Sequence, residues 1–455
     1  MSAFWSATAL LPTGWAQNIR FTVTDGLIAS VEAGVAAGTA DEMLQITLPG
    51  LANVHSHAFQ RGMAGLAEHR GYGTNANSDD NFWSWREVMY RFLDRLNPDD
   101  MEAVAAMAYA EMLETGYTHV GEFHYLHGDT DGRAYANPAE MAARIAAAAR
   151  ATGIGLTLLP VFYAHSNFGG AAPNHGQRRF IHSLDSFARL LEACPALLSP
   201  GDQLGIAPHS LRAVTPDELA ALTALHPQSP IHIHAAEQQK EVADSLAFSG
   251  QRPVEWLLDH AGLDERWCLI HATHLTDAET DALAASGAVA GLCPITEANL
   301  GDGIFPALRY LAAGGRIATG TDSNVLIDPA QELRGLEYSQ RLAHQARNVL
   351  ASEAFPSVAR RLFEATLAGG AQAMGIAPGL AVGHPADFVT LNSAHPALHG
   401  RSGDQWLDNW IFAARGGCID SVWKRGRQVV SGGLHRDSAA ITARYLKVVD
   451  RIMAA

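Results

Sequence analysis

Between residues 49 and 379 the chain alternates short apolar runs with longer amphipathic stretches. Apolar runs bounded by glycine, proline and polar residues favour buried strands, whereas apolar positions spaced three and four apart favour helices. This strand–helix repetition predicts an α/β fold, a (β/α)8 TIM-type barrel. The predicted strands cover residues 51–57, 118–124, 155–163, 203–210, 230–236, 267–274, 288–295 and 316–322. The predicted helices include residues 140–151, 216–224, 253–261, 277–286 and 305–314, with candidate N-caps at Thr215 and Thr276.

The two ends of the chain carry a different pattern, typical of short strands and tight turns. Residues 1–48 hold apolar runs around the Asp25-Gly26 hairpin signal, which is too little for an independent sheet domain. Matching runs occur near the other end, at residues 386–391, 419–423 and 428–430. We therefore predict a small composite β-sandwich domain built from residues 1–48 and 380–455, with the barrel formed by residues 49–379.

Composition narrows the class of protein. With 48% hydrophobic and 17% charged residues among 455, the chain has enough apolar residues for a large core. A formal net charge of −15 argues against nucleic acid or an anionic membrane surface as a partner. The four cysteines are far apart and form no Cys-x-x-Cys pair, and the N-terminus has no basic leader region. These features predict a soluble cytoplasmic protein.

Histidine and carboxylate side chains gather at the C-terminal ends of the predicted strands. His55 and His57 leave the same face of the first strand, because side chains alternate along a strand. One such pair alone could be a local hydrogen-bonded pair, but active sites of these barrels lie at the strand ends. The pattern at five strand ends therefore predicts a metal centre. The other strand ends carry His209 and Arg212, His232, His234 and Glu237, His271 and His274, and Asp322.

Three neutral histidines and one carboxylate can hold a divalent metal and leave room for a water molecule. Zinc lowers the pKa of such a water to about 7, although iron and manganese accept similar ligands. Glu237, three residues beyond His234, could serve there as a proton shuttle without being a ligand. A two-metal site with a carbamylated lysine is not expected, because no lysine follows the fourth predicted strand; the lysines are Lys240, Lys424 and Lys447.

The motifs resemble those of the amidohydrolase superfamily, in particular its mononuclear aminohydrolases. They are His-x-His on the first strand, His-x-x-Glu on the fifth, a histidine on the sixth and Thr-Asp-Ser on the eighth. The resemblance covers essentially the whole chain and implies one divalent metal per chain, with Zn²⁺ expected, and a homodimer. His232, one layer deeper, is expected to be structural or to support a metal ligand from behind, with a role as ligand as the minor alternative. The implied metal ligands are His55, His57, His234 and Asp322, and the implied catalytic groups are Glu237 as proton shuttle, His271, which orients the hydroxide or polarises the substrate, and Asp322.

Four separate stretches carry a closer resemblance. They begin at His55, Phe82, Glu122 and Ala207 and read His-Ser-His-Ala-Phe-Gln-Arg-Gly-Met-Ala-Gly, Phe-Trp-Ser-Trp-Arg-Glu-Val-Met-Tyr, Glu-Phe-His-Tyr-Leu-His and Ala-Pro-His-Ser-Leu-Arg. All four are similar to the formimidoylglutamate deiminases, hydrolases of histidine degradation that convert N-formimino-L-glutamate and water to N-formyl-L-glutamate and ammonia. The resemblance implies attack of a metal-bound hydroxide on the formimino carbon, with Glu237 carrying the proton to the departing nitrogen.

That substrate has two carboxylates, which arginine binds well through paired N–H groups. The candidate partners are Arg86, in an expected aromatic loop, and Arg212. We expect Gln60, Tyr125 and His209 to hydrogen-bond the formimino group or a carboxylate. Structural roles stay open for most of them: Arg86 could only stack on its aromatic neighbours, Arg212 could be a surface charge, and Gln60 and Tyr125 could cap backbone groups.

Two long segments follow the first and third predicted strands, residues 69–86 and 164–180. They are rich in glycine, asparagine and histidine. Because functional loops of a barrel follow its strands, we expect both segments to border the active site.

Two other functions compete with this hypothesis. A deaminase of a purine, a pyrimidine or an adenosyl thioether would share the metal motif, but it needs a flat apolar slot with few cations. A non-catalytic barrel that serves as a binding module would not need the complete ligand set or Glu237.

Overall fold

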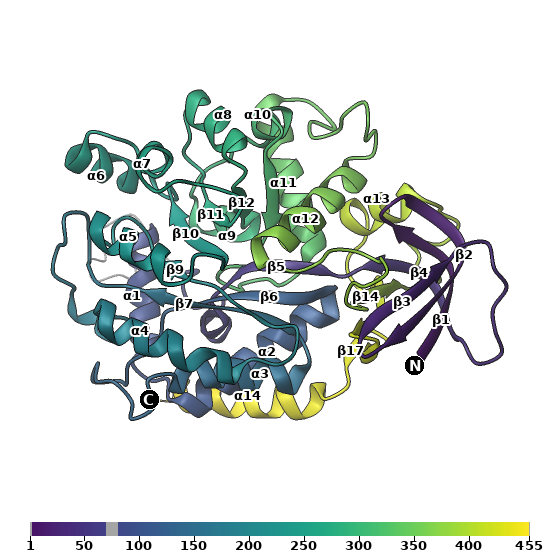
Figure 1. Ribbon diagram of the computed structural model, residues 1–455, viewed down its shortest axis with the longest axis horizontal. Helices are drawn as coiled ribbons and strands as arrows, with labels where there is room; N and C mark the ends of the chain where they lie inside the picture. The colour runs from purple at the N-terminus through teal and green to yellow at the C-terminus, as the bar shows by residue number, and fades with distance from the viewer. Residues whose placement is uncertain (1, 70–80, 455) are drawn as a thin grey trace.

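The computed structural model describes residues 2–69 and 81–454. Parallel strands form a barrel that is surrounded by helices, and a curved sheet lies at one end of it (Figure 1). The α/β barrel expected from the sequence is confirmed. Its strands are β5 (Leu51–Ser56), β6 (Tyr117–His124), β7 (Gly155–Phe162), β8 (Gln203–Leu204), β9 (Ala207–Pro208), β10 (Ile231–Ala235), β11 (Trp267–His271), β12 (Val289–Leu292) and β13 (Arg316–Thr319).

Two runs of paired strands form the barrel wall, β5 to β9 and β10 to β13. Single parallel bridges close it: Ser56 pairs with Asp322, and Ser210 pairs with His234. The fourth predicted strand is interrupted, so that β8 and β9 replace one continuous strand. At the interruption, the N–H of Ile206 donates to Pro230 O at 2.9 Å, next to β10.

Most helices follow the barrel strands and cover the outside of the wall. Thr215 and Thr276 act as N-caps as predicted, because each accepts a hydrogen bond from the N–H of a glutamate three residues on, whose side chain bonds back. The helix expected at 305–314 is shorter and begins after Pro306. The helices are α1 (Phe82–Leu93), α2 (Pro98–Thr115), α3 (Glu140–Thr152), α4 (Leu184–Ala193), α5 (Pro216–Leu225), α6 (Gln239–Ser249), α7 (Pro253–His260), α8 (Asp277–Ser286), α9 (Pro294–Leu300), α10 (Ala307–Ala312), α11 (Pro329–His344) and α12 (Val358–Met374).

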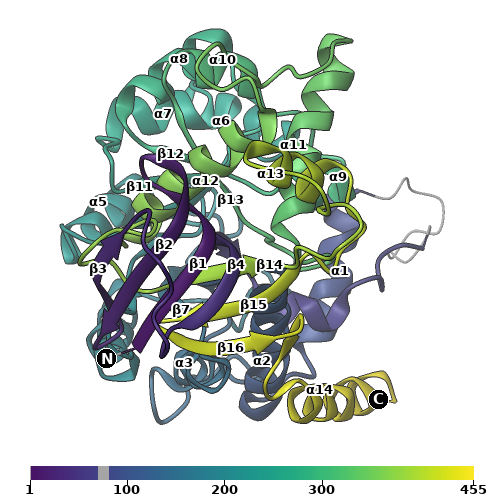
Figure 2. The ribbon, with the colours of Figure 1, turned by 90° about the vertical axis from the view of Figure 1, so that its right-hand side faces the viewer.

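Strands from both ends of the chain form one continuous sheet (Figure 2). The N-terminal and C-terminal parts meet where β4 pairs with β14 in antiparallel fashion. Phe4 of β1 and Trp423 of β15 have ring centroids 5.0 Å apart. A flat sheet would place strands three steps apart at about 14 Å, so the sheet curls around its own core in a sandwich-like way. The strands, in sheet order, are β17 (Leu434–His435), β16 (Arg427–Ser431), β15 (Ile419–Lys424), β14 (Phe388–Leu391), β4 (Glu42–Pro49), β1 (Ser2–Leu11), β2 (Gly14–Thr24) and β3 (Leu27–Glu32).

The C-terminal segment also contributes helices to the barrel side. Helix α13 (Asp404–Phe412) receives a 2.8 Å hydrogen bond from Trp15 Nε1 of β2 through Asp404 Oδ1. Helix α14 (Ser438–Met453) runs beside α2 (Figure 1), where Arg95 donates to Ile452 O at 2.7 Å. The domain boundaries at residues 48 and 380 stay a prediction. Among the described residues, no helix combines the length and apolar character that crossing a bilayer requires.

Candidate active site

The candidate site lies at the C-terminal ends of the barrel strands. His55 lies near the end of β5, His234 lies in β10, and His271 ends β11. Asp322 comes three residues after the end of β13 and is buried, as are these histidines. Parallel strands that close into a barrel bring their ends to one face, which explains how residues 267 positions apart in the sequence meet.

Close contact between the first and last barrel strands fixes part of the site. The N–H of Asp322 donates to His55 O, and the N–H of His57 donates to Asp322 O, both at 2.9 Å. Gly320 makes this approach possible, because a Cβ at this position would lie 2.6 Å from His55 N. Any larger residue at position 320 would push the two strands apart.

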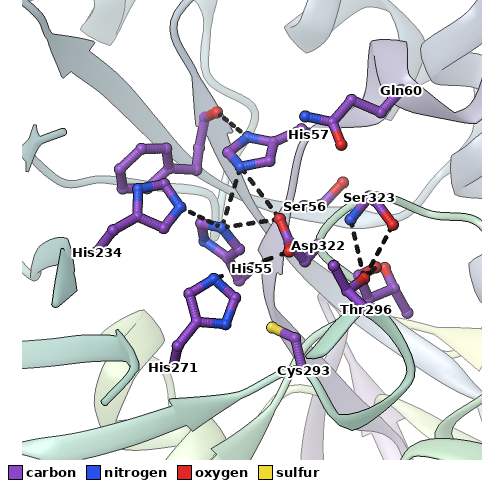
Figure 3. Close-up of polar contacts among 12 residues, drawn as sticks. His55, Ser56, His57, Gln60, His234, His271, Cys293, Thr296, Asp322 and Ser323 are labelled. Carbon is purple, nitrogen blue, oxygen red and sulfur yellow. Dashed lines mark hydrogen bonds and ion pairs between the residues drawn. The ribbon is translucent and has the colours of Figure 1, made fainter. Parts of the chain in front are cut away.

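Three imidazoles and one carboxylate converge on one point (Figure 3). Nε2 of His55 lies 3.2 Å from Nε2 of His57 and 3.1 Å from Nε2 of His234. Oδ1 of Asp322 lies 3.2 Å from His57 Nε2 and 3.4 Å from His55 Nε2. A tetrahedral site with metal–nitrogen bonds of about 2.05 Å needs neighbouring donors about 3.3 Å apart. These four separations match that spacing, and all four donor atoms lie within 4.8 Å of one another.

The outer nitrogens of two of these rings decide which nitrogens can bind a metal. His57 Nδ1 donates to Phe123 O at 2.9 Å, and His234 Nδ1 donates to His209 O at 3.0 Å. A neutral imidazole carries one hydrogen, so Nε2 of both rings has a free lone pair. Burial lowers the pKa of His55 to about 3 and that of His234 well below its usual range, so these rings are neutral. The donor set therefore fits a divalent metal.

Glu237 lies just beyond β10 and faces the same point. Its Oε1 is 3.8 Å from His271 Nε2, and its Oε2 is 3.9 Å from Arg212 Nη2. Burial raises the pKa of Glu237, although His271 and Arg212 oppose the rise. Burial disfavours a charged His271, but Glu237, Glu297 and Asp322 outweigh it and raise the pKa of His271 to about 10. A molecule placed between this carboxylate and this imidazole could exchange a proton with either.

Backbone strain is concentrated at the same strand ends. Ala236, His271, Ala272 and Asp322 have φ angles of 51°, 69°, 47° and 45°, in the left-handed region that favours glycine. Such residues cost about 1–3 kcal/mol each and persist only where the surroundings hold them. Here the N–H of Ala272 donates to Ala235 O at 3.0 Å, across neighbouring strands. The fold therefore fixes these side chains in directions that relaxed strand ends would not give.

The predicted substrate-binding residues line one cavity, together with most of the predicted metal ligands and catalytic residues. The cavity wall also contains Trp85, Met89, Tyr90, Tyr163 and Phe180, which are largely apolar. His55 is fully buried beneath the cavity and does not line it. The predicted residues that do line it are His57, Gln60, Arg86, Tyr125, His209, Arg212, His234, Glu237, His271 and Asp322.

Arg212 is not a surface charge. Only 6% of it is exposed, and it faces the carboxylates of Glu237 and Glu241, each at 3.9 Å. Its Nε has no hydrogen-bond partner among the described residues. A buried guanidinium with an unsatisfied N–H group is costly, which is the property expected of a group that binds an anionic ligand.

The expected aromatic loop around Arg86 is wrong, because Arg86 lies on helix α1. The helix forms here because Asn81 accepts hydrogen bonds from the N–H groups of Trp83 and Ser84 and so caps it. The Arg86 guanidinium lies 4.8 Å from the Trp83 ring centroid and 5.4 Å from that of Tyr90. It therefore stacks on aromatic rings, as the structural interpretation held, and also lines the cavity.

Of the two expected active-site loops, the second is described in full and the first only in part. Of segment 69–86, residues 70–80 lie outside the described residues. Segment 164–180 contains a short 3-10 helix, η2 (His175–Gln177), and its last residue, Phe180, lines the cavity. At least the end of the second segment therefore borders the site.

Gln60 and Tyr125 bond to each other rather than to the backbone. Gln60 Nε2 donates to Tyr125 Oη at 3.0 Å, while Gln60 Oε1 has no partner among the described residues. His209 contributes both its side chain, which lines the cavity, and its carbonyl, which orients His234. His232 points elsewhere: its Nε2 donates to Ala373 O at 2.8 Å, so it is a structural residue as expected.

Sequence reasoning missed two buried carboxylates next to the site. Glu122 accepts a 2.7 Å hydrogen bond from the N–H of Ala58, and burial raises its pKa to about 7. Glu297 lies 3.2 Å from His271 Nδ1. Glu122 stands inside one of the four stretches that carried the resemblance, which is a signal that could have identified it. Glu297 lies in a helix whose sequence gives no comparable signal.

Two family descriptions match the chain. Residues 46–429 match the amidohydrolase family, and residues 1–45 match a family described as formimidoylglutamate deiminase HutF, N-terminal domain. A curated formimidoylglutamate deiminase of Pseudomonas aeruginosa is 50% identical over 100% of both chains. A 5'-deoxyadenosine deaminase of Methanothermobacter thermautotrophicus is 26% identical over 93% of this chain and 92% of its own.

Solved structures agree with these matches. An amidohydrolase from Brucella melitensis is 54% identical, covers 100% of both chains and has a TM-score of 0.95. An adenosine deaminase from Xanthomonas campestris with bound zinc shares the fold, with a TM-score of 0.79 at 22% identity over 100% of this chain and 98% of its own. The resemblance to the formimidoylglutamate deiminases is confirmed. The chain belongs to the amidohydrolase family.

Proposed function

We propose that the protein hydrolyses N-formimino-L-glutamate to N-formyl-L-glutamate and ammonia, a step of histidine degradation. The observation that carries this proposal is the presence of two guanidinium groups, Arg86 and Arg212, in the cavity that is also lined by three of the four residues of the metal-type donor set. The substrate has two carboxylates and one hydrolysable C–N bond, so it needs both kinds of group. The whole-length identity of 50% to a curated formimidoylglutamate deiminase supports the same reaction.

We propose that one divalent ion binds to His55, His57, His234 and Asp322. These residues offer a three-nitrogen, one-oxygen donor set that suits Zn²⁺, although other transition metals accept it too. A metal bound there supplies Lewis acidity and lowers the pKa of a coordinated water to about 7.

The proton transfers are assigned to the chain's own residues. Glu237 takes the proton of the attacking water and passes it to the departing nitrogen, because it is buried, faces the donor group and has a raised pKa. His271 and Asp322 hold the attacking oxygen, since both residues line the cavity and His271 Nε2 lies 3.8 Å from Asp322 Oδ2. Ammonia leaves when the tetrahedral adduct collapses.

Substrate binding falls to the polar groups of the cavity wall. Arg86 and Arg212 are assigned to the two carboxylates, because a guanidinium presents paired N–H groups to a carboxylate. Gln60 Oε1, which has no partner among the described residues, is placed to accept an N–H of the formimino group. Tyr125 and His209 complete the polar wall.

Cellular setting and assembly are also part of the proposal. The four cysteines are buried and unpaired, which suits a reducing compartment such as the cytoplasm. We propose a homodimer on the basis of the sequence resemblance.

Substrate selectivity tests this function against its rival. A deaminase of a purine, a pyrimidine or an adenosyl thioether remains the second candidate, because a 5'-deoxyadenosine deaminase is 26% identical to this chain. We expect ammonia release from N-formimino-L-glutamate to exceed release from guanine, cytosine and S-adenosylhomocysteine by at least about 100-fold in kcat/KM, since none of the three offers a pair of carboxylates to Arg86 and Arg212. Faster turnover of any of the three heterocyclic compounds would contradict the proposal.

A further inference from the structure

A carboxylate outside the cavity contacts the far edge of the His271 ring. Nδ1 of His271 lies 3.2 Å from Oε1 of Glu297 in α9. On the opposite edge, Nε2 lies 3.8 Å from both Glu237 Oε1 and Asp322 Oδ2. His271 and Glu297 are buried, with 1% and 6% of their surface exposed. The two nitrogens of the ring therefore face separate partners, one inside the cavity and one behind it.

Glu297 is itself fixed at the beginning of α9. Its Oε1 accepts the N–H of Cys293 at 2.8 Å, and its own N–H donates to Cys293 O at 2.8 Å. Toward the N–H of Cys293, Oε1 acts as a hydrogen-bond acceptor. It therefore acts as an acceptor toward His271 too, so that Nδ1 of His271 carries the hydrogen. His271 has the strained φ of 69°, so its position depends on such external contacts.

We propose that Glu297 is a positioning residue for the hydrolysis assigned above. It holds the Nδ1–H of His271, fixes the plane of the ring and keeps Nε2 directed at the reacting centre. The arrangement has the form of a carboxylate that orients a catalytic imidazole from behind, and such partners control activity without touching the substrate. This inference rests on the proposed function of the site.

The helix start offers a matched control. Glu332 of α11 is also buried, and its Oε2 accepts the N–H of Ile295 at 2.9 Å. Glu297 and Glu332 thus both bond to the backbone at the beginning of α9, but only Glu297 bonds to His271. Substitution of either residue by alanine removes a hydrogen bond to the N-terminal end of α9, but only substitution of Glu297 also removes the contact to the His271 ring.

The test compares Glu297→Ala, Glu297→Gln, Glu332→Ala and Glu332→Gln in the full-length, metal-loaded protein. We expect Glu297→Ala to lower kcat for N-formimino-L-glutamate by about 10- to 100-fold, with KM changed less than about threefold and metal content unchanged. KM should hold because the cavity arginines are untouched. Glu297→Gln should lie between Glu297→Ala and the wild type, since the amide oxygen still accepts an N–H. Both Glu332 variants should keep the wild-type kcat.

Several outcomes overturn the inference. Wild-type kcat in Glu297→Ala and Glu297→Gln would remove the positioning role, and equal losses in the Glu332 variants would reduce it to helix packing. Loss of metal together with activity would assign Glu297 to the metal centre instead. If Glu297→Ala does not fold, Glu297→Gln against Glu332→Gln decides the question. Failure of the wild type to act on the substrate would instead contradict the proposed function.

Discussion

Replacing Glu237 by Gln is expected to lower kcat for N-formimino-L-glutamate by about 10²- to 10⁴-fold, the range typical of a lost general acid–base group. The amide has nearly the same shape, but it can neither take the proton of the attacking water nor pass it on. Because only the ionised carboxylate accepts a proton, wild-type kcat/KM should fall as the pH drops through the pKa of Glu237. Burial raises that pKa, so this acid limb should lie above the usual glutamate value of about 4.5.

Two controls make the Glu237 experiment decisive. Metal content of Glu237→Gln should equal that of the wild type, because Glu237 does not belong to the convergent donor set. Glu279→Gln is a matched substitution of another buried glutamate, which pairs with Arg252 outside the cavity, and it should leave kcat unchanged. Near-normal turnover in a metal-loaded Glu237→Gln protein would show that Glu237 is not the proton shuttle.

Replacing Arg212 by Ala is the second large effect that we expect. Removing one partner of a buried, hydrogen-bonded charge pair costs about 2–5 kcal/mol, which is roughly 30- to 4,000-fold in kcat/KM. The loss should come mainly from a higher KM, because Arg212 is assigned to a substrate carboxylate. Arg212→Lys should recover part of it, since the charge remains but the paired N–H geometry is lost. Arg309→Ala, which removes an arginine paired on the outer helices, is the control.

Shortened substrates identify the carboxylate that Arg212 binds. N-formiminoglycine lacks the side-chain carboxylate, and N-formimino-4-aminobutyrate lacks the α-carboxylate. With the compound that lacks the carboxylate bound by Arg212, the loss of kcat/KM caused by Arg212→Ala should largely disappear. With the other compound, the loss of kcat/KM caused by Arg86→Ala should largely disappear. Unchanged kcat/KM in Arg212→Ala with the full substrate would exclude a binding role.

The barrel could be predicted from the sequence because its elements give local signals, whereas the choice of metal ligands came from the family resemblance. Buried parallel strands appear as short apolar runs, and capping boxes such as Thr215 with Glu218 mark where helices begin. Once the barrel is predicted, the ends of its strands must meet, so histidines of different strands become neighbours. The proximity of the His57 and His234 side chains follows from this geometry.

Other features depend on contacts that the sequence does not display. Arg86 lies on a helix because Asn81 caps it, within a segment whose glycines and asparagines favoured a loop. The break between β8 and β9 lies where Ile206 bonds to Pro230, just before β10. Glu297 meets His271 because α9 follows β12, the strand that pairs with β11. Each depends on tertiary packing rather than on residues close in the chain.

Ammonia release from N-formimino-L-glutamate, measured with the metal content of the same preparation, tests the central claim most directly. We expect kcat/KM above about 10⁴ M⁻¹s⁻¹ and one divalent ion per chain. Activity should be lost when a chelator removes the metal and recovered when the metal is added back. A protein that holds its metal and yet releases no ammonia from this substrate would contradict the proposed function, and full activity without metal would contradict the metal centre.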